Sequence, residues 1–146
     1  MMKIKKVLEQ KELDILTDKS ADFGELHFVF SEEYLSRLKN WLDDGFQFFA
    51  LEDDKFAGYI AAIKSEKDKN SLQIVELFVD PAYQGKSFGT KLVEKMIALA
   101  KENNFFGIIV QTEKENIPAQ KLYEKLGFEE IKILDWSDGI TYRYII

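Results

Sequence analysis

An apolar run from Gln73 to Val79 leads into a loop that carries two glycines, Gly85 and Gly89, and then into a helical pattern from Thr90 to Lys101. Two glycines between a strand and a helix let the main chain turn tightly and let a ligand approach the backbone closely. The unpaired N–H groups at a helix start and the helix dipole both favour an anion there. On its own, this segment is consistent with a backbone phosphate site or with a plain strand-to-helix turn.

The size and composition of the chain exclude several classes of site. A chain of 146 residues has the usual size of one domain, so a single domain over residues 1–146 is expected. The chain has no cysteine, which excludes disulfides, thiolate nucleophiles and thiolate metal sites. Its one histidine, His27, argues against a histidine metal site or a Ser-His-Asp triad, so no metal is expected.

The charge balance indicates the kind of partner. The chain has 20 Lys and Arg against 26 Asp and Glu, a net charge of −6, which argues against a nucleic-acid partner. An acidic protein attracts a cationic substrate such as a polyamine, although the same charge also serves solubility alone. No apolar run approaches the roughly 20 residues that span a bilayer, and the N-terminus lacks the apolar core of a signal peptide. A cytoplasmic protein without a membrane partner is therefore expected.

Periodicity and turn residues predict eleven elements. Helices are interleaved with strands late in the chain, so the class is α/β or α+β with a mixed sheet. The stretch from Ala21 to Phe30 is ambiguous. The predicted strands are Lys3–Val7, Phe46–Leu51, Lys55–Lys64, Leu72–Val79, Gly107–Val110, Phe128–Leu134 and Ile140–Ile146, and the predicted helices are Glu9–Lys19, Ser31–Leu42, Phe88–Asn103 and Asn116–Leu126.

Four motifs in a fixed order then resemble the GNAT superfamily of acetyl-CoA-dependent N-acetyltransferases, over roughly residues 46 to 134. A strand ends in Leu77-Phe78-Val79-Asp80-Pro81, and Tyr83-Gln84-Gly85-Lys86-Ser87-Phe88-Gly89 opens a helix. A second strand leads to Asn116, Ala119 and Gln120, and Leu122-Tyr123-Glu124-Lys125-Leu126-Gly127-Phe128 closes the next helix. Each motif alone is weak, and their order and spacing together are specific.

The resemblance implies a three-layer fold, with a mixed central sheet of about six or seven strands flanked by about four helices. It also implies acetyl-CoA as the acyl donor, lying between two splayed parallel strands, Leu72–Val79 and Gly107–Val110. The pantetheine arm would pair with the backbone of Leu77, Phe78 and Val79. The pyrophosphate would be held by the loop and helix start, which consist of Gln84, Gly85, Lys86, Ser87, Phe88, Gly89 and Thr90.

Ser87 departs from the family pattern, which usually has the first loop glycine at this position. Serine takes a positive φ less readily than glycine. Three consequences remain open at this stage: a negative φ at Ser87, a weaker affinity for the cofactor, or an extra hydrogen bond from the Ser87 hydroxyl to phosphate. A degenerate loop in a non-catalytic acyl-CoA-binding module is the corresponding alternative to an enzyme.

Tyr123 is the candidate general acid, because it aligns with the tyrosine that the family places near the thioester sulfur. A phenol with a pKa near 10 is matched to protonating a leaving thiolate; the alternative is an aromatic that packs on the sheet. Asn116 would hydrogen-bond the cofactor arm, a role compatible with capping the helix. The oxyanion donor would be a backbone N–H near Phe78 or Val79.

Glu76 is the candidate general base. It interrupts an apolar strand, where an unpaired buried carboxylate is costly, and partial burial would raise its pKa. Strand alternation puts its side chain opposite those of Val75, Leu77 and Val79. Many family members keep a glutamate in this strand as a direct or water-mediated base. The alternative is a solvated or salt-bridged carboxylate on the outward face.

The expected acceptor is an amine, with a small cationic molecule favoured over a protein or peptide. The ribosomal-protein N-terminal acetyltransferases of the family carry a glutamate base five residues before the asparagine, and this chain has Gln111 there, with Glu113 close by. The closing hairpin also allows edge-to-edge pairing into a homodimer. Residues expected near the acceptor come from Ser20–Phe30, Ser65–Asn70 and Asp135–Asp138; they include Asp22, Phe23, Glu25, Phe28, Phe30, Asp135, Trp136 and Asp138.

Overall fold

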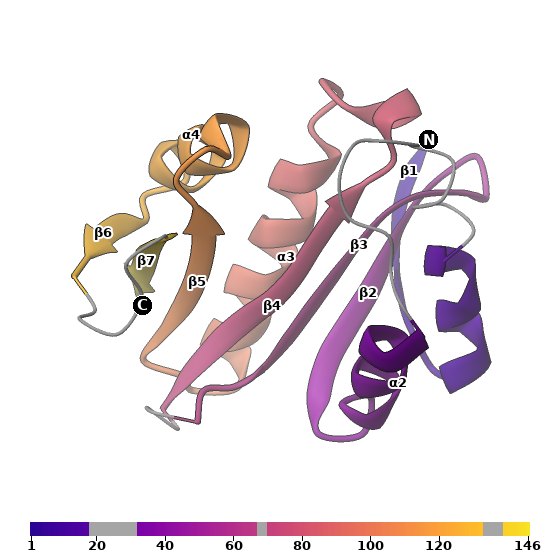
Figure 1. Cartoon of the computed structure of the whole chain (residues 1–146), viewed down its shortest axis with the longest axis horizontal. Helices are drawn as coiled ribbons and strands as arrows, with labels where there is room; N and C mark the ends of the chain where they lie inside the picture. Colours follow the sequence, from indigo (N-terminus) through magenta and orange to yellow (C-terminus); the bar gives the residue numbers. More distant parts are fainter. Residues whose placement is uncertain (18–31, 67–69, 133–138) are drawn as a thin grey trace.

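The computed structural model describes residues 1–17, 32–66, 70–132 and 139–146 (Figure 1). The order of strands and longer helices agrees with the prediction from sequence, and the short 3-10 helix η3 was not predicted. In chain order they are β1 (Met2–Lys6), the 3-10 helix η1 (Gln10–Asp14), α2 (Glu32–Asn40), β2 (Gly45–Glu52), β3 (Lys55–Lys64), β4 (Ser71–Val79), the 3-10 helix η3 (Pro81–Tyr83), α3 (Phe88–Glu102), β5 (Gly107–Glu113), α4 (Ile117–Lys125), β6 (Glu129–Ile131) and β7 (Gly139–Ile145).

Most differences from the prediction lie at element ends. The helix predicted from Glu9 starts as the 3-10 turn η1, where the Glu12 carboxylate accepts hydrogen bonds from the backbone N–H groups of Leu8 and Glu9 at 2.9 Å. Helix α2 ends two residues earlier than predicted, at Asn40. Strand β5 runs on to Glu113, and β6 is shorter than the predicted strand Phe128–Leu134.

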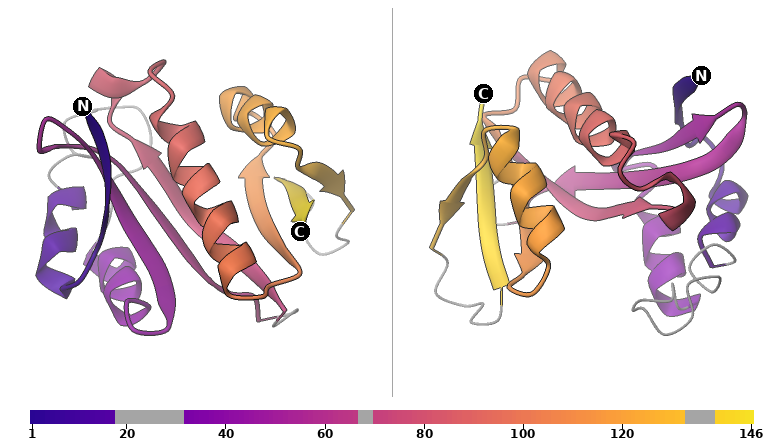
Figure 2. Two further views of the ribbon diagram at one scale, coloured as in Figure 1. Left: turned by 180° about the vertical axis from the view of Figure 1, so that it is seen from behind. Right: turned by 90° about the horizontal axis from the view of Figure 1, so that it is seen from above.

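The seven strands form one mixed sheet in the order β1-β2-β3-β4-β5-β7-β6. Strands β4 and β5 pair in parallel, and the other described neighbours pair antiparallel. Figure 2 shows α3 and α4 on one face of the sheet and η1 and α2 on the other. The predicted fold class, a three-layer α/β arrangement with a mixed sheet and a parallel strand pair, is therefore confirmed.

Each face of the sheet has its own hydrophobic core. Helix α3 covers the first core, where Leu92, Met96 and Ile108 are fully buried. Elements η1 and α2 cover the second core, which includes Leu13 and Leu38. Central strands must therefore supply apolar side chains to both faces, which is why β3 is buried along most of its length.

Strand β4 contains a β-bulge that changes which side chains face which core. Ala61 of β3 pairs with Glu76 and Ala62 pairs with Ile74, so Val75 is an extra residue without a partner on β3. Before the bulge, Ile74 packs in the α3 core; after it, Leu77 does so, whereas Val75 packs in the α2 core. The bulge therefore turns Glu76 toward α2.

None of the described helices is both long enough and apolar enough to span a bilayer.

Candidate functional site

Strands β4 and β5 separate halfway along their length. Their parallel pairing runs from Ser71 and Gly107 to Ile74 and Val110. Beyond that pair, β4 continues to Val79 and β5 to Glu113 without pairing with each other. Figure 1 shows the two strands diverging toward α4 and the turn that precedes α3. The gap that the resemblance implied between these two strands is thus present.

Backbone groups of β4 line this gap. The Asp80 N–H donates to the Ala57 carbonyl oxygen at 2.8 Å, so Asp80 points its N–H toward β3. Antiparallel pairing alternates along a strand, and Phe78 pairs toward β3 in the same way. Leu77 and Val79 therefore point their N–H and C=O groups into the gap, and of the three residues expected to pair with a ligand these two present their backbone to it.

The loop between β4 and α3 adopts two left-handed conformations. Gly85 has φ +78°, and Ser87 has φ +70° and ψ +15°. The option of a negative φ at Ser87 was therefore wrong, because the chain must turn sharply here to enter α3. A serine in this region costs about 1 kcal/mol relative to glycine. The other two options for Ser87, a weaker affinity and an extra hydrogen bond, stay predictions.

The start of α3 leaves donors available. The Ser87 side chain makes no capping hydrogen bond, and the Ser87 carbonyl accepts from Lys91 N at 3.0 Å. The N–H groups of Phe88, Gly89 and Thr90 lie in the first turn, where they have no partner within the helix. Their direction and the helix dipole suit a phosphate group.

The side chains of the loop divide into exposed and buried ones. Gln84, Lys86 and Ser87 are exposed, whereas the Phe88 ring is buried and stacks edge-on against Tyr83, with ring centroids 5.5 Å apart. The Gln84 amide donates to the Val79 carbonyl oxygen at 3.3 Å and ties the loop to the end of β4. Phe88 can therefore offer a ligand only its backbone.

Helix α4 starts on the far side of the gap with Asn116 as its cap. The Asn116 side-chain oxygen accepts from Ala119 N at 3.2 Å, so the capping role is observed, and a role toward a cofactor stays a prediction. The Gln120 amide donates to the carbonyl oxygens of Glu113 and Lys114 at 3.1 and 2.8 Å. These bonds fix the connection between β5 and α4.

Tyr123 lies in the core under α4, with 3% of its surface exposed. Its ring packs against Phe128 and Tyr142, with centroid distances of 5.4 and 6.0 Å. Burial, and then the negative charge of Glu76, raise the pKa of Tyr123 above the usual value for a phenol. The hydroxyl therefore stays protonated at neutral pH, and it is a weaker acid than an exposed tyrosine.

Glu76 points toward α2 and is partly buried. The Tyr34 hydroxyl donates a hydrogen bond to Glu76 Oε2 at 2.9 Å. Burial raises the pKa of Glu76 to about 7, against the opposing effects of the Tyr34 hydroxyl and of the Leu77 backbone N–H. The carboxyl is thus not a solvated group on an outward face, and its pKa suits a base that works near neutral pH.

The alternation argument for Glu76 was right for two of three neighbours. Leu77 and Val79 pack in the α3 core, opposite Glu76. Val75 instead packs in the α2 core, because the bulge interrupts the alternation. The charge of Glu76 raises the pKa of Tyr123 on α4 and of Tyr59 on β3, so the candidate base and the candidate acid lie within electrostatic reach of each other.

Tyr34 was not identified from the sequence as a site residue. It matched the apolar spacing of helix α2 and read as a core aromatic. The residue pair Tyr34 and Glu76 is separated by 42 positions, so no local pattern could connect them. Gln111 is exposed, and its amide is 3.5 Å from Thr141 Oγ1.

The residues expected near the acceptor mostly lie outside the described part of the chain. This holds for Asp22, Phe23, Glu25, His27, Phe28, Phe30, Asp135, Trp136 and Asp138.

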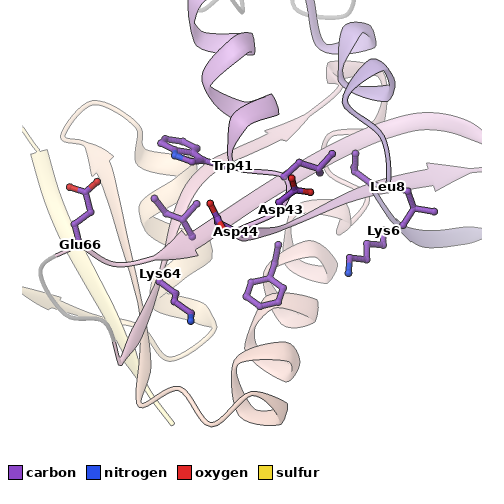
Figure 3. Close-up of a pocket in the computed structure, with 12 residues that line it drawn as sticks. Lys6, Leu8, Trp41, Asp43, Asp44, Lys64 and Glu66 are labelled. Atoms are coloured by element: carbon purple, nitrogen blue, oxygen red, sulfur yellow. The ribbon is translucent and has the colours of Figure 1, made fainter.

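A surface depression of about 810 Å³ lies away from the gap (Figure 3). It is formed where β1 ends, β2 begins and β3 ends, and its lining includes Lys6, Trp41, Asp43 and Lys64. This end of β3 pairs with the start of β4, whereas the gap lies at the end of β4. The depression and the candidate site are consequently separate features.

Comparison with known proteins agrees with this geometry. The Acetyltransferase (GNAT) family model matches residues 13–128. An uncharacterized N-acetyltransferase of Methanocaldococcus jannaschii is 30% identical over 139 residues, which cover 83% of this chain and 61% of the relative. N-alpha-acetyltransferase 30 of Schizosaccharomyces pombe is 30% identical over 103 residues, which cover 69% of this chain and 64% of the relative. The chain thus matches less than two thirds of the length of either relative.

A solved structure shares the whole fold. The PaiA N-acetyltransferase of Thermoplasma acidophilum, crystallised in complex with coenzyme A, superposes with a TM-score of 0.77. It is 18% identical in sequence, and the match covers 100% of this chain and 99% of that protein.

Proposed function

The chain belongs to the GNAT family of acetyltransferases, and from this premise we propose that it transfers an acetyl group from acetyl-CoA to a primary amine. The observation that carries the proposal is the gap between β4 and β5, with a loop of helix-start N–H groups at its end. We further propose that residues 1–146 act as one acetyltransferase domain, since their strands complete one sheet.

The residues present suit acetyl-CoA. Leu77 and Val79 form a strand edge that faces no neighbouring strand, so the amides of a pantetheine arm can add to it in the way that a peptide adds to a sheet. The N–H groups from Gly85 to Thr90 offer donors to a pyrophosphate. The PaiA structure, which contains coenzyme A in the same fold, supports this assignment. When bound, acetyl-CoA supplies the activated acetyl group.

Two side chains would move the protons of the reaction. Glu76, as carboxylate, accepts a proton from the ammonium or attacking amine, directly or through water, so that the nitrogen lone pair is free. The amine nitrogen bonds to the acetyl carbon and the carbon–sulfur bond breaks. Tyr123 donates its proton to the leaving thiolate, which departs as a thiol. A gap-facing N–H of β4 stabilises the charge that develops on the acetyl oxygen.

We propose a small cationic amine as the acceptor. The net charge of −6 supports this choice, because it attracts cations over long range. A peptide N-terminus or lysine is the second candidate, and the similarity to N-alpha-acetyltransferase 30 of fission yeast favours it. Against it, Gln111 cannot take a proton at the position where the ribosomal-protein enzymes of the family carry a base.

A thiol-release assay with acetyl-CoA tests the proposal. The full chain is incubated with polyamines, aminoglycosides, amino acids and basic peptides in turn, beside the Tyr123→Phe variant. Release that requires one class of amine and falls in Tyr123→Phe is the expected result and identifies the acceptor class. Absence of release with every amine, together with a thermal shift by acetyl-CoA, would replace the enzyme with an acyl-CoA-binding module.

A further inference from the structure

Helix α2 contributes a side chain to the candidate site. The Tyr34 hydroxyl donates to Glu76 Oε2 at 2.9 Å and also contacts the Val75 carbonyl oxygen at 3.3 Å. We propose that Tyr34 is a positioning residue for the general base, which fixes the direction of the Glu76 carboxylate and stabilises its ionised form. The assignment of Glu76 as the base rests on the proposed function; the contact between the two residues does not.

The bulge in β4 explains why one hydroxyl reaches both groups. Because Val75 has no partner on β3, its carbonyl is at a break in the regular ladder, where a side chain can approach it. The same bulge turns the Glu76 side chain toward α2. The Tyr34 hydroxyl therefore contacts both groups that the bulge repositions, the Val75 carbonyl oxygen and the Glu76 carboxylate.

The described titratable groups that interact with Glu76 are phenols from three different elements. Tyr34 lies on α2, Tyr59 on β3 and Tyr123 on α4, and each has its pKa raised by burial first and by the charge of Glu76 as a further cause. Arg37, which is also on α2, opposes this shift, because its positive charge lowers the pKa of Tyr34. Within the described part of the chain, Tyr34 is the phenol whose hydroxyl donates a hydrogen bond to the Glu76 carboxylate.

Tyr59 provides a matched control for Tyr34. Its hydroxyl donates to Gln47 Oε1 at 2.5 Å, and the Gln47 amide donates to the Leu38 carbonyl at 2.8 Å. Tyr59→Phe therefore removes a buried phenol on the same face of the sheet without removing the hydrogen bond to Glu76. Any general effect of losing a buried hydroxyl should appear in both variants.

The first experiment titrates Glu76 in the full chain by carbon NMR, with ¹³C-labelled glutamate and no acetyl-CoA or amine. Glu76→Gln assigns the signal by its disappearance. Tyr34→Phe should raise the pKa of Glu76 by about 1, because a hydrogen bond to the charged form is lost. Tyr59→Phe should change it much less. An unchanged Glu76 pKa in folded Tyr34→Phe, or equal changes in both variants, would overturn the proposal.

A second variant reverses the expected direction. Replacing Tyr34 with 3-fluorotyrosine keeps the ring and makes the hydroxyl a stronger donor, so the pKa of Glu76 should fall. This variant keeps the packing of α2 and therefore covers the case in which Tyr34→Phe fails to fold. A rise, or no change, in the pKa of Glu76 would contradict the proposed role of the hydroxyl.

Kinetics separate this proposal from the proposed function. With an amine from the panel, the acid limb of kcat/KM against pH should move to higher pH in Tyr34→Phe by the same amount as the NMR titration. In Tyr34→Phe, kcat/KM on the plateau above the acid limb should fall far less than kcat/KM at low pH. If the wild-type protein shows no turnover with any amine, the proposed function is overturned. If the wild-type protein is active but the acid limb of its pH profile does not move in Tyr34→Phe, only the role of Tyr34 is overturned.

Discussion

Ile74 and Val110 are the last residues through which β4 and β5 pair in parallel. Beyond them, Leu77 and Val79 turn their backbone groups toward a gap instead of toward a neighbouring strand. An extended amide chain is the natural occupant of such a gap, because it can restore the missing hydrogen bonds of the sheet.

Hydrogen exchange should reveal that pairing directly. On addition of acetyl-CoA, the amide of Val79 should exchange more slowly, by about tenfold or more, because it acquires an acceptor; the amide of Leu77 should slow less, because its N–H already interacts with the Glu76 carboxylate. The amide of Phe78, which pairs toward β3, should change less and serves as the internal control. Equal protection of all three amides would mean that the ligand stiffens the strand without pairing with it.

Ser87→Gly should stabilise the protein. Glycine adopts the φ of +70° without strain, so the free energy of unfolding should rise by about 0.5–1 kcal/mol, as measured by denaturant titration. The affinity for acetyl-CoA, measured by calorimetry, should stay within about twofold. A clearly weaker affinity would instead show that the Ser87 hydroxyl contacts phosphate.

Gly85→Ala is the matched control for that variant. A Cβ at Gly85 would have no atom within 4 Å, so a steric clash cannot contribute to the outcome. The φ of +78° is nevertheless unfavourable for alanine, and about 1 kcal/mol should be lost. Opposite signs for the two substitutions would confirm that the loop conformation sets both effects.

Tyr123→Phe should lower kcat by about a hundredfold, because the leaving thiolate loses its proton donor. The Kd for acetyl-CoA should stay nearly unchanged, since the ring remains packed against Phe128 and Tyr142. The raised pKa of Tyr123 also predicts that the wild-type enzyme loses no activity through this group up to about pH 10. An unchanged kcat in Tyr123→Phe would assign protonation of the thiolate to another group or to water.

Glu76→Gln should stabilise the protein at pH 8 and much less at pH 5. Burial raises the pKa of Glu76 from 4.5 to about 7, so the folded state binds a proton more tightly than the unfolded state. The carboxyl therefore destabilises the fold progressively as the pH rises from about 4.5 to 7, by at most about 3 kcal/mol. Thermal melting of both proteins across this range measures the difference, and a constant difference at all pH values would contradict the buried carboxyl.

Many of the helix and strand boundaries can be predicted from the sequence, because glycine, proline and asparagine occur at the ends of these elements. Asn116 with Pro118 begins α4, and Gly127, with φ +100°, follows its end. At Ser87 the residue type does not predict the backbone conformation. Serine disfavours the left-handed conformation, but the turn into α3 requires it.

The bulge and the contact made by Tyr34 are not predictable in the same way. Neither glycine nor proline marks Val75, and the extra residue becomes visible only through the register with β3. The acid–base candidates were found through the aligned motif and an acid in an apolar strand. Their supporting contacts depend on how α2 packs across the sheet, which the local sequence does not encode.

The bulge in β4 changes which alternate side chains of the strand face α3. Up to Ile74 the even-numbered side chains face α3, and from Leu77 onward the odd-numbered ones do. If Val75 instead paired with β3 as an ordinary strand residue, the alternation continuing from Ile74 would press the Glu76 carboxylate into the apolar layer under α3 and turn Leu77 to the opposite face. One unpaired residue thus lets a single strand supply apolar side chains to the core under α3 on both sides of the bulge and still direct the Glu76 carboxylate to the opposite face of the sheet.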